Sequence, residues 1–289
     1  MAILESFDIS SWQGSPTAEV AAVDALEAGK VVYLPQLHFS LSAAELQLLS
    51  PACLDGKSKN LSYRPDSGAL GHAGYQGEKR DQLLAIMRRY YEQSSSLLNM
   101  LCPEYSGHLR PGFTSFRPIE IAGRTASARQ DDTRLHTDAF RTRPMQGLRI
   151  LRVFSNVNPQ APRVWRVGEP FEQAAAKFVP QIGRPLPGSA RLLSLLGLVK
   201  GRRTEYDHLM LGIHDRMKSD DHYQSQVSQE KIDFPPGATW ICYTDWVAHA
   251  AMSGQFAFEQ TFYLPVAAMK DINRSPLRVL ETLTGRSLL

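Results

Sequence analysis

The stretch with the clearest chemical potential is Arg134-Leu-His-Thr-Asp-Ala-Phe140, which contains the only His-x-Asp triplet in the chain. In an extended strand, alternate side chains point to the same face, so His136 and Asp138 would project together. An imidazole and a carboxylate on one face supply two adjacent metal ligands. A third ligand from elsewhere would complete a facial triad with open coordination positions, which is the arrangement of non-heme Fe(II) oxygenases.

His249 is the natural third ligand. It lies in Trp246-Val-Ala-His-Ala-Ala-Met-Ser-Gly-Gln255, at the start of a small-residue strand that turns at Ser253-Gly254. By contrast, His208 and His214 are six residues apart on an expected helix, a spacing that does not place them on one helical face. We therefore expect a metal site made by His136, Asp138 and His249.

The elements that must position these residues follow from hydrophobic periodicity and from capping and turn residues. Expected strands cover 30–35, 112–121, 147–157, 240–243 and 256–264, and the segment 127–136 could enter another. Expected helices cover 16–29, 43–49 (capped by Ser40 or Ser42), 78–101, 189–199, 206–217 and 275–285, with one more ending at Phe178. The polar segment 55–77 is interpreted as a loop.

No repeat period or low-complexity linker divides the chain, so we expect a single domain over residues 1–289. The strands around both histidine segments predict a mainly β core, a closed antiparallel sandwich, over about 111–265. A helical N-terminal part (1–110), a helical insert (about 169–230) and the C-terminal helix 275–285 would flank it.

Arginine is concentrated around the candidate metal site. Residues 110–166 contain many arginines, no lysine, and only four acidic residues: Glu120, Asp131, Asp132 and Asp138. Because the guanidinium group matches carboxylate and phosphate, this favours an anionic substrate, although a solvated basic face explains the cluster equally well. Arg152 shares a strand face with Leu148, Ile150 and Phe154, so it needs either a bound dicarboxylate or a buried protein acid as its partner.

Composition excludes several classes of protein. The chain has 289 residues, 43% hydrophobic and 21% charged, with a net charge of +3. No apolar run reaches the roughly 20 residues of a membrane span, and no signal peptide or nucleic-acid motif is evident. Three scattered cysteines, Cys53, Cys102 and Cys242, are typical of buried thiols in a reducing compartment. We expect a cytoplasmic protein that has no transmembrane segment and binds no nucleic acid.

Four segments of the chain together resemble a known enzyme family. The segments 134–140, 148–156 (Leu-Arg-Ile-Leu-Arg-Val-Phe-Ser-Asn), 162–168 (Pro-Arg-Val-Trp-Arg-Val-Gly) and 249–255 are similar to those of the Kdo hydroxylases, within the jelly-roll (double-stranded β-helix) dioxygenases that depend on Fe(II) and 2-oxoglutarate. The resemblance implies O2 and 2-oxoglutarate as cosubstrates. It also implies hydroxylation at C3 of 3-deoxy-D-manno-oct-2-ulosonic acid (Kdo), giving D-glycero-D-talo-oct-2-ulosonic acid (Ko).

The resemblance further implies that His136, Asp138 and His249 bind Fe(II). Many relatives use an arginine 10–14 residues after the second histidine to hold the distal carboxylate of 2-oxoglutarate, but residues 247–269 contain no arginine or lysine. We expect Arg152 in this role, with Arg117 and Arg129 as alternatives and Gln260 or Thr261 as neutral helpers. Arg141 and Arg143 would hold the sugar carboxylate.

The substrate implied by the resemblance is a Kdo-containing glycolipid of the lipopolysaccharide inner core, and it would require peripheral contact of the enzyme with the inner membrane surface. The apolar segment 192–199 is compatible with such contact. Other readings stay open at the level of sequence. They are a hydroxylase of another small anionic substrate or of a protein, a jelly-roll metalloenzyme without 2-oxoglutarate, and a non-catalytic jelly-roll sugar-binding protein.

Overall fold

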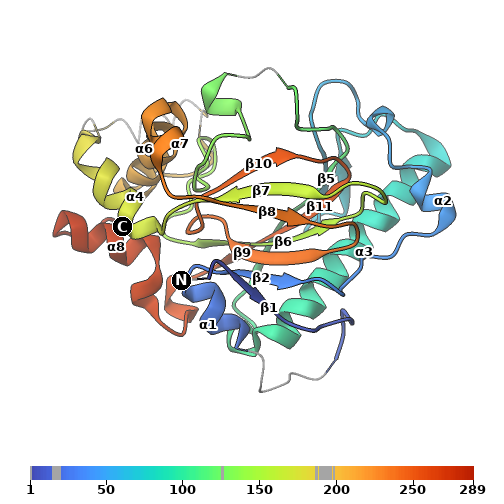
Figure 1. Ribbon diagram of the computed structural model, residues 1–289, viewed down its shortest axis with the longest axis horizontal. Coiled ribbons are helices and arrows are strands. Elements are labelled where there is room, and N and C mark those ends of the chain that lie inside the picture. The colour runs from blue at the N-terminus through green and yellow to red at the C-terminus, as the bar shows by residue number, and fades with distance from the viewer. Residues whose placement is uncertain (1, 15–20, 125–126, 186–187, 189–196, 198) are drawn as a thin grey trace.

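The computed structural model describes residues 2–14, 21–124, 127–185, 188, 197 and 199–289. Within these residues the core is a sandwich of two sheets (Figure 1). The larger sheet has eight strands in the order β1 (Leu4–Ser6), β2 (Val31–Leu34), β9 (Thr239–Tyr243), β6 (Arg149–Asn156), β11 (Ala257–Leu264), β5 (Arg110–Arg117), β3 (Leu61–Arg64) and β4 (Ala69–Gly71). The smaller sheet has the order β10 (His249–Ser253), β7 (Arg163–Val167) and β8 (Glu230–Phe234). Apart from the parallel pair β1–β2, the pairing is antiparallel, which confirms the expected fold class.

Aromatic side chains join the two sheets. Phe154 on β6 stacks on Trp240 of β9 with ring centroids 5.3 Å apart, and Trp165 of β7 meets both rings edge-on. The other face of the large sheet packs on the long helix α3 (Gly77–Leu101), whose Tyr90 donates a hydrogen bond to the carbonyl oxygen of Val153 at 3.1 Å. Strand β6 is therefore buried along its whole length, because both of its faces are covered.

The remaining helices are α1 (Ala22–Glu27), α2 (Ala43–Leu46), α4 (Phe171–Phe178), α6 (Glu205–Ser219), α7 (Asp221–Gln226) and α8 (Pro276–Thr284). Short 3-10 turns cover Pro51–Cys53, Pro103–Tyr105, Ala128–Gln130, Val179–Gln181, Val266–Ala268 and Ile272–Arg274. Figure 1 shows α4, α6 and α7 gathered at one end of the sheets, beside α8. None of the described helices is long and apolar enough to cross a bilayer.

Local signals account for the helix ends. Ser42, rather than Ser40, caps α2 through a capping box with Glu45. Ser275 caps α8, Pro276 occupies its first turn, and Gly285 adopts the left-handed conformation that ends it. The expected helices 78–101 and 206–217 are confirmed. The expected start of helix 16–29 and nearly all of the helix 189–199 lie outside the described residues.

The expected loop over 55–77 is wrong, because it contains the hairpin β3–β4. Leu61 and Tyr63 are buried while their neighbours are not, so the strand is amphipathic but only four residues long. Its turn, Pro65-Asp66-Ser67-Gly68, places Gly68 at φ +67°, as such turns require. The N-terminal 110 residues, expected to be mainly helical, thus supply β1 to β4 to the two ends of the large sheet.

One buried ion pair fixes the loop after β9. Arg149 and Asp245 have side chains that are 0% and 1% exposed, and Arg149 Nε donates to Asp245 Oδ2 at 2.8 Å. Burial raises the pKa of Asp245 despite this guanidinium partner. The pair matters for the site because the neighbouring Thr244 carbonyl accepts a hydrogen bond from the backbone N–H of Asp138 at 2.7 Å.

We predict that Arg149→Met lowers the free energy of unfolding by about 3–5 kcal/mol, because it leaves a buried carboxylate without its partner. Chemical denaturation measures this directly. The double variant Arg149→Met/Asp245→Leu should recover most of the loss. Arg88→Met, which breaks an exposed pair with Glu92, is the control and should change little. A single variant as stable as the wild type would contradict the assignment.

Candidate metal centre and its chamber

Two backbone hydrogen bonds bring the candidate ligands together. The N–H of His136 donates to the carbonyl of His249 at 3.0 Å, and the N–H of His249 donates to the carbonyl of His136 at 2.9 Å. The imidazole centroids are 4.8 Å apart as a result. The structure places the candidate ligand atoms of His136, Asp138 and His249 within 4.8 Å of one another.

The expected strand through the His-x-Asp triplet is reduced to this single bridge. Asp138 makes no ladder contact, and its N–H instead reaches the Thr244 carbonyl in the loop after β9. The triplet is nevertheless extended enough for the two side chains to approach, with His136 Nε2 3.9 Å from Asp138 Oδ1. His136 and Asp138 therefore project together as predicted, although they lie in an extended segment with a single bridge and not in a regular strand.

The protonation states suit a metal. Nδ1 of His136 lies 2.8 Å from the carbonyl of Arg134, and Nδ1 of His249 lies 2.9 Å from that of Val247. A proton on each Nδ1 leaves each Nε2 lone pair free for a metal. Burial lowers the pKa of both imidazoles. Burial alone would raise the pKa of Asp138, but the Arg152 guanidinium and the two imidazoles outweigh it and hold that pKa below its usual range.

The three side chains open into a cavity of about 220 Å³, here called the inner chamber. Its lining consists of the three candidate ligands together with Arg117, Asp132, Phe140, Arg152, Phe154, Arg163, Trp165, Ala251 and Glu259. A wider outer chamber of about 440 Å³ adjoins it and shares Arg117, Phe140, Arg152 and Glu259 with it. The path from the outside to the candidate metal centre therefore runs past two arginines.

Arg152 is already neutralised by protein acids. Its guanidinium lies 3.1 Å from Asp138 Oδ2 and 3.0 Å from Glu259 Oε1. Arg117 also binds Glu259, with its Nε 3.0 Å from Oε2. The geometry supports the buried ion pair that the sequence left open for Arg152.

The other predicted cosubstrate residues are separated by the fold. Thr261 lines the outer chamber. Gln260 does not line the outer chamber, because side chains alternate along β11 and Gln260 points to the opposite face, which meets α3. There its amide oxygen accepts a hydrogen bond from the hydroxyl of Thr114. Arg129 is 66% exposed and lies 4.0 Å from Asp215, and it lines neither chamber.

The two arginines predicted to bind substrate, Arg141 and Arg143, also lie in different places. Arg143 lines the outer chamber, with its guanidinium 4.6 Å from the centroid of Phe113. Arg141 is 48% exposed and pairs with Asp215 on α6 at 2.5 Å, because the turn after Phe140 directs it away from the chambers.

Sequence reasoning missed several lining residues, of which Glu259, Trp165, Arg163 and Arg64 bear most on the site. Glu259 and Trp165 could have been found from strand alternation, since they share faces with Thr261 and Arg163. Arg163 itself was one of many arginines without a distinguishing signal. Arg64 lies in the segment interpreted as a loop and lines the outer chamber.

His208 and His214 are not expected to form a ligand pair, and in the structure they have different neighbours. His208 Nε2 lies 2.8 Å from the carbonyl of Gly183. His214, however, packs edge-on against the His136 ring at 5.3 Å. It supports the orientation of a candidate ligand without belonging to the clustered group.

The chain matches the family model described as 3-deoxy-D-manno-oct-2-ulosonic acid (Kdo) hydroxylase over residues 10–287. It is similar to crystal structures of the Kdo hydroxylase KdoO, a non-heme Fe(II) alpha-ketoglutarate (2-oxoglutarate) dependent dioxygenase. The complex with alpha-ketoglutarate and Fe(III) shows 45% identity and a TM-score of 0.96, covering 100% of this chain and 98% of that one. The cobalt(II) complex shows 46% and 0.97, covering 99% and 97%.

The complex of KdoO with succinate and Fe(III) shows 45% identity and a TM-score of 0.95, covering 99% of this chain and 97% of that one. None of the curated proteins compared matches the chain. The family match and the structural likeness both run over nearly the whole chain, and the chain belongs to the Kdo hydroxylase family.

Proposed function

We propose that this protein is an Fe(II)- and 2-oxoglutarate-dependent dioxygenase that hydroxylates Kdo, with His136, Asp138 and His249 as the iron ligands. The observation that carries the proposal is the buried cluster of two imidazoles and one carboxylate in a chain that belongs to the Kdo hydroxylase family. Two imidazoles and one carboxylate are the donor set of the facial triad in non-heme Fe(II) oxygenases.

When bound, iron with 2-oxoglutarate and O2 supplies the oxidising power for hydroxylating an unactivated C–H bond. The chain's own part is positioning. The carbonyls of Arg134 and Val247 orient the two imidazoles, and Arg152 holds Asp138 ionised. Trp165 stacks on the His249 ring at 5.1 Å, which restricts ring rotation and keeps that side of the centre apolar.

The outer chamber is the proposed sugar site. Arg64 and Arg143 both lie over the Phe113 ring, at 5.3 and 4.6 Å from its centroid. Within the described part of the chain, neither guanidinium is within 4.0 Å of a carboxylate. Two such cations at the entrance suit a sugar acid, whose carboxylate would fix the ring with C3 directed to the metal. Hydroxylation at C3 would give Ko.

We further propose that the natural substrate is a Kdo-containing glycolipid, because the outer chamber opens to solvent and could accept one sugar of a larger molecule. Such a substrate would set the enzyme to work in the cytoplasm at the inner membrane surface. A hydroxylase acting on another small sugar acid is the alternative, and the same pair of arginines would serve it.

The first test is metal and cosubstrate binding. Anaerobic addition of Fe(II) and 2-oxoglutarate to the wild type should produce the weak visible charge-transfer band of the chelate. His136→Ala, Asp138→Asn and His249→Ala should each lower metal affinity by at least about 100-fold, since even changes beyond the ligands cost 10–100-fold. His208→Ala is the matched control and should bind normally. A folded ligand variant with unchanged metal affinity removes that residue from the triad.

The second test is turnover. Incubation with Kdo-lipid A, free Kdo and unrelated sugar acids, followed by mass spectrometry, should show a gain of one oxygen on Kdo-containing substrates coupled to succinate formation. Product from free Kdo alone would refute the glycolipid requirement. If the chelate band is present but no Kdo substrate gives product, the protein would still be an Fe(II)- and 2-oxoglutarate-dependent oxygenase, and its substrate would be a compound other than Kdo.

The third test separates the sugar site from the metal centre. Arg143→Gln and Arg64→Gln should each raise KM for the Kdo substrate about 10-fold or more, because each removes a charged hydrogen-bond donor. The affinity for 2-oxoglutarate should stay unchanged. Arg141→Gln, two residues from Arg143 but paired with Asp215, is the control. An unaltered KM in both variants would place the sugar outside this chamber.

A further inference from the structure

Asp132 is a chamber carboxylate to which the described part of the chain donates no hydrogen bond. Three carboxylates line the inner chamber, and arginine side chains hold two of them, Asp138 at 3.1 Å and Glu259 at 3.0 Å. Among the described residues, the one cation within 4.0 Å of Asp132 is Arg124, whose Nη1 lies 3.9 Å from Oδ2. That separation exceeds a hydrogen bond. The Asp132 side chain is 35% exposed, so its oxygens are open to a ligand.

The backbone fixes Asp132 beside the candidate metal centre. Its carbonyl accepts a hydrogen bond from the N–H of Ala251 at 2.8 Å, and Ala251 lies two residues after His249 on β10. The next carbonyl, that of Thr133, accepts from Nη2 of Arg166 on β7 at 2.7 Å. Asp132 is therefore attached to two strands of the smaller sheet, and its carboxylate has a defined place in the chamber wall.

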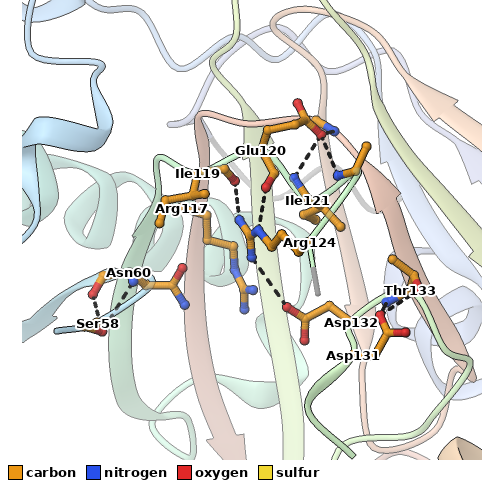
Figure 2. Close-up of polar contacts among 12 residues, drawn as sticks. Ser58, Asn60, Arg117, Ile119, Glu120, Ile121, Arg124, Asp131, Asp132 and Thr133 are labelled. Atoms are coloured by element: carbon orange, nitrogen blue, oxygen red, sulfur yellow. Dashed lines mark hydrogen bonds and ion pairs between the residues drawn. The ribbon is translucent and has the colours of Figure 1, made fainter. Parts of the chain in front are cut away.

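The two neighbouring acids of this segment have different surroundings (Figure 2). Asp131 Oδ1 accepts hydrogen bonds from the backbone N–H and the hydroxyl of Thr133, at 2.9 and 2.7 Å, and Asp131 lines neither chamber. Asp132 points the other way, toward Arg124, and lines the inner chamber. Asp131 is thus satisfied within its own turn, whereas Asp132 faces whatever enters the chamber.

The chambers present complementary groups to a sugar acid. Arg64 and Arg143 lie over the Phe113 ring in the outer chamber, and Asp132 lines the inner chamber alone. An ionised carboxylate accepts strong hydrogen bonds from hydroxyl groups and repels other carboxylates. A sugar that directs a hydroxyl to Asp132 therefore keeps its own carboxylate near the two arginines. At about 220 Å³ the inner chamber must also hold the cosubstrate, so only one edge of the sugar enters it.

The chemical structure of Kdo matches this arrangement. In 3-deoxy-D-manno-oct-2-ulosonic acid the carboxylate is attached to C2, C3 is a methylene, and C4 carries a hydroxyl. The carbon to be hydroxylated thus lies between a carbon that bears the carboxylate and a carbon that bears a hydroxyl. Contacts to both neighbours would fix C3 relative to the metal, and such positioning is a large part of what a protein contributes to catalysis.

We propose that Asp132 determines specificity by accepting a hydrogen bond from the C4 hydroxyl of Kdo, while the arginines of the outer chamber hold the sugar carboxylate. The inference rests on the proposed function and names a further residue of that site. A site built to bind a hydroxyl discriminates against analogues that lack it. The enzyme would therefore require a Kdo unit whose C4 hydroxyl is free.

The test is a double-mutant cycle between one side chain and one hydroxyl. Anaerobic calorimetry on the Co(II)-loaded protein with 2-oxoglutarate would measure binding of Kdo-lipid A and of its analogue made with 4-deoxy-Kdo. The wild type should bind the analogue about 10- to 100-fold more weakly, as expected for a hydrogen bond to a charged group. Asp132→Ala should bind both lipids with affinities within about threefold of each other, because the contact is then absent from both complexes.

Two further variants serve as controls. Asp132→Asn keeps the shape of the side chain and removes its charge, so it should lose only part of the preference for Kdo. Asp131→Asn makes the same change at the adjacent acid outside both chambers, and it should discriminate between the two lipids as the wild type does.

Coupling of the two half-reactions separates positioning from folding. The wild type should form succinate and hydroxylated product in equal amounts. In Asp132→Ala, C3 is held less firmly, so succinate should exceed product at saturating Kdo-lipid A, with the chelate band of Fe(II) and 2-oxoglutarate retained.

Equal affinity of the wild type for the two lipids would overturn the inference and spare the proposed function. An Asp132→Ala protein that binds both lipids more weakly by the same factor would also overturn it, because the residue would then act through the structure of the chamber. Failure of the wild type to bind Kdo-lipid A at all would instead remove the proposed function.

Discussion

The ion pairs of Arg152 hold the centre of the molecule together. One guanidinium, buried on the middle strand of the sandwich, reaches a candidate metal ligand on one side and Glu259 of the adjacent strand on the other. It keeps Asp138 ionised in a space where burial alone would favour the neutral acid. Each of the three charges depends on the others, because an isolated charge in this environment would be costly.

This network explains why the arginines of the region divide into different roles. Arg149 and Arg152 have protein acids as partners and stabilise the sandwich. Arg141 and Arg129 pair with Asp215 at the surface. Arg64, Arg143 and Arg163 face the chambers without carboxylate partners among the described residues, so their charges are available to an incoming anion. Residue type alone does not separate these groups; their acidic neighbours do.

The strands of the sandwich and the long helix α3 could be predicted from the sequence because they depend on strong local patterns, whereas the clustering of His136, Asp138 and His249 was predicted from residue types that suit a metal. It did not predict the hairpin β3–β4, whose strands are too short and polar to stand out. The roles expected for the arginines stay predictions. Which face Gln260 occupies depends on strand register, and which arginine lacks a partner depends on acids distant in sequence, so neither can be deduced from spacing.

The mutual hydrogen bonds of His136 and His249 have a consequence for biosynthesis. The two residues are remote in the chain, and joining them requires closure of a long loop, which is entropically costly and slow. A nascent chain lacking β10 would already have the His-x-Asp triplet but only two of the three candidate ligands. Iron could be captured by all three ligands only once β10 had been made and the smaller sheet had closed. Metal uptake would then act as a late checkpoint that favours the fully assembled chain over partly folded forms.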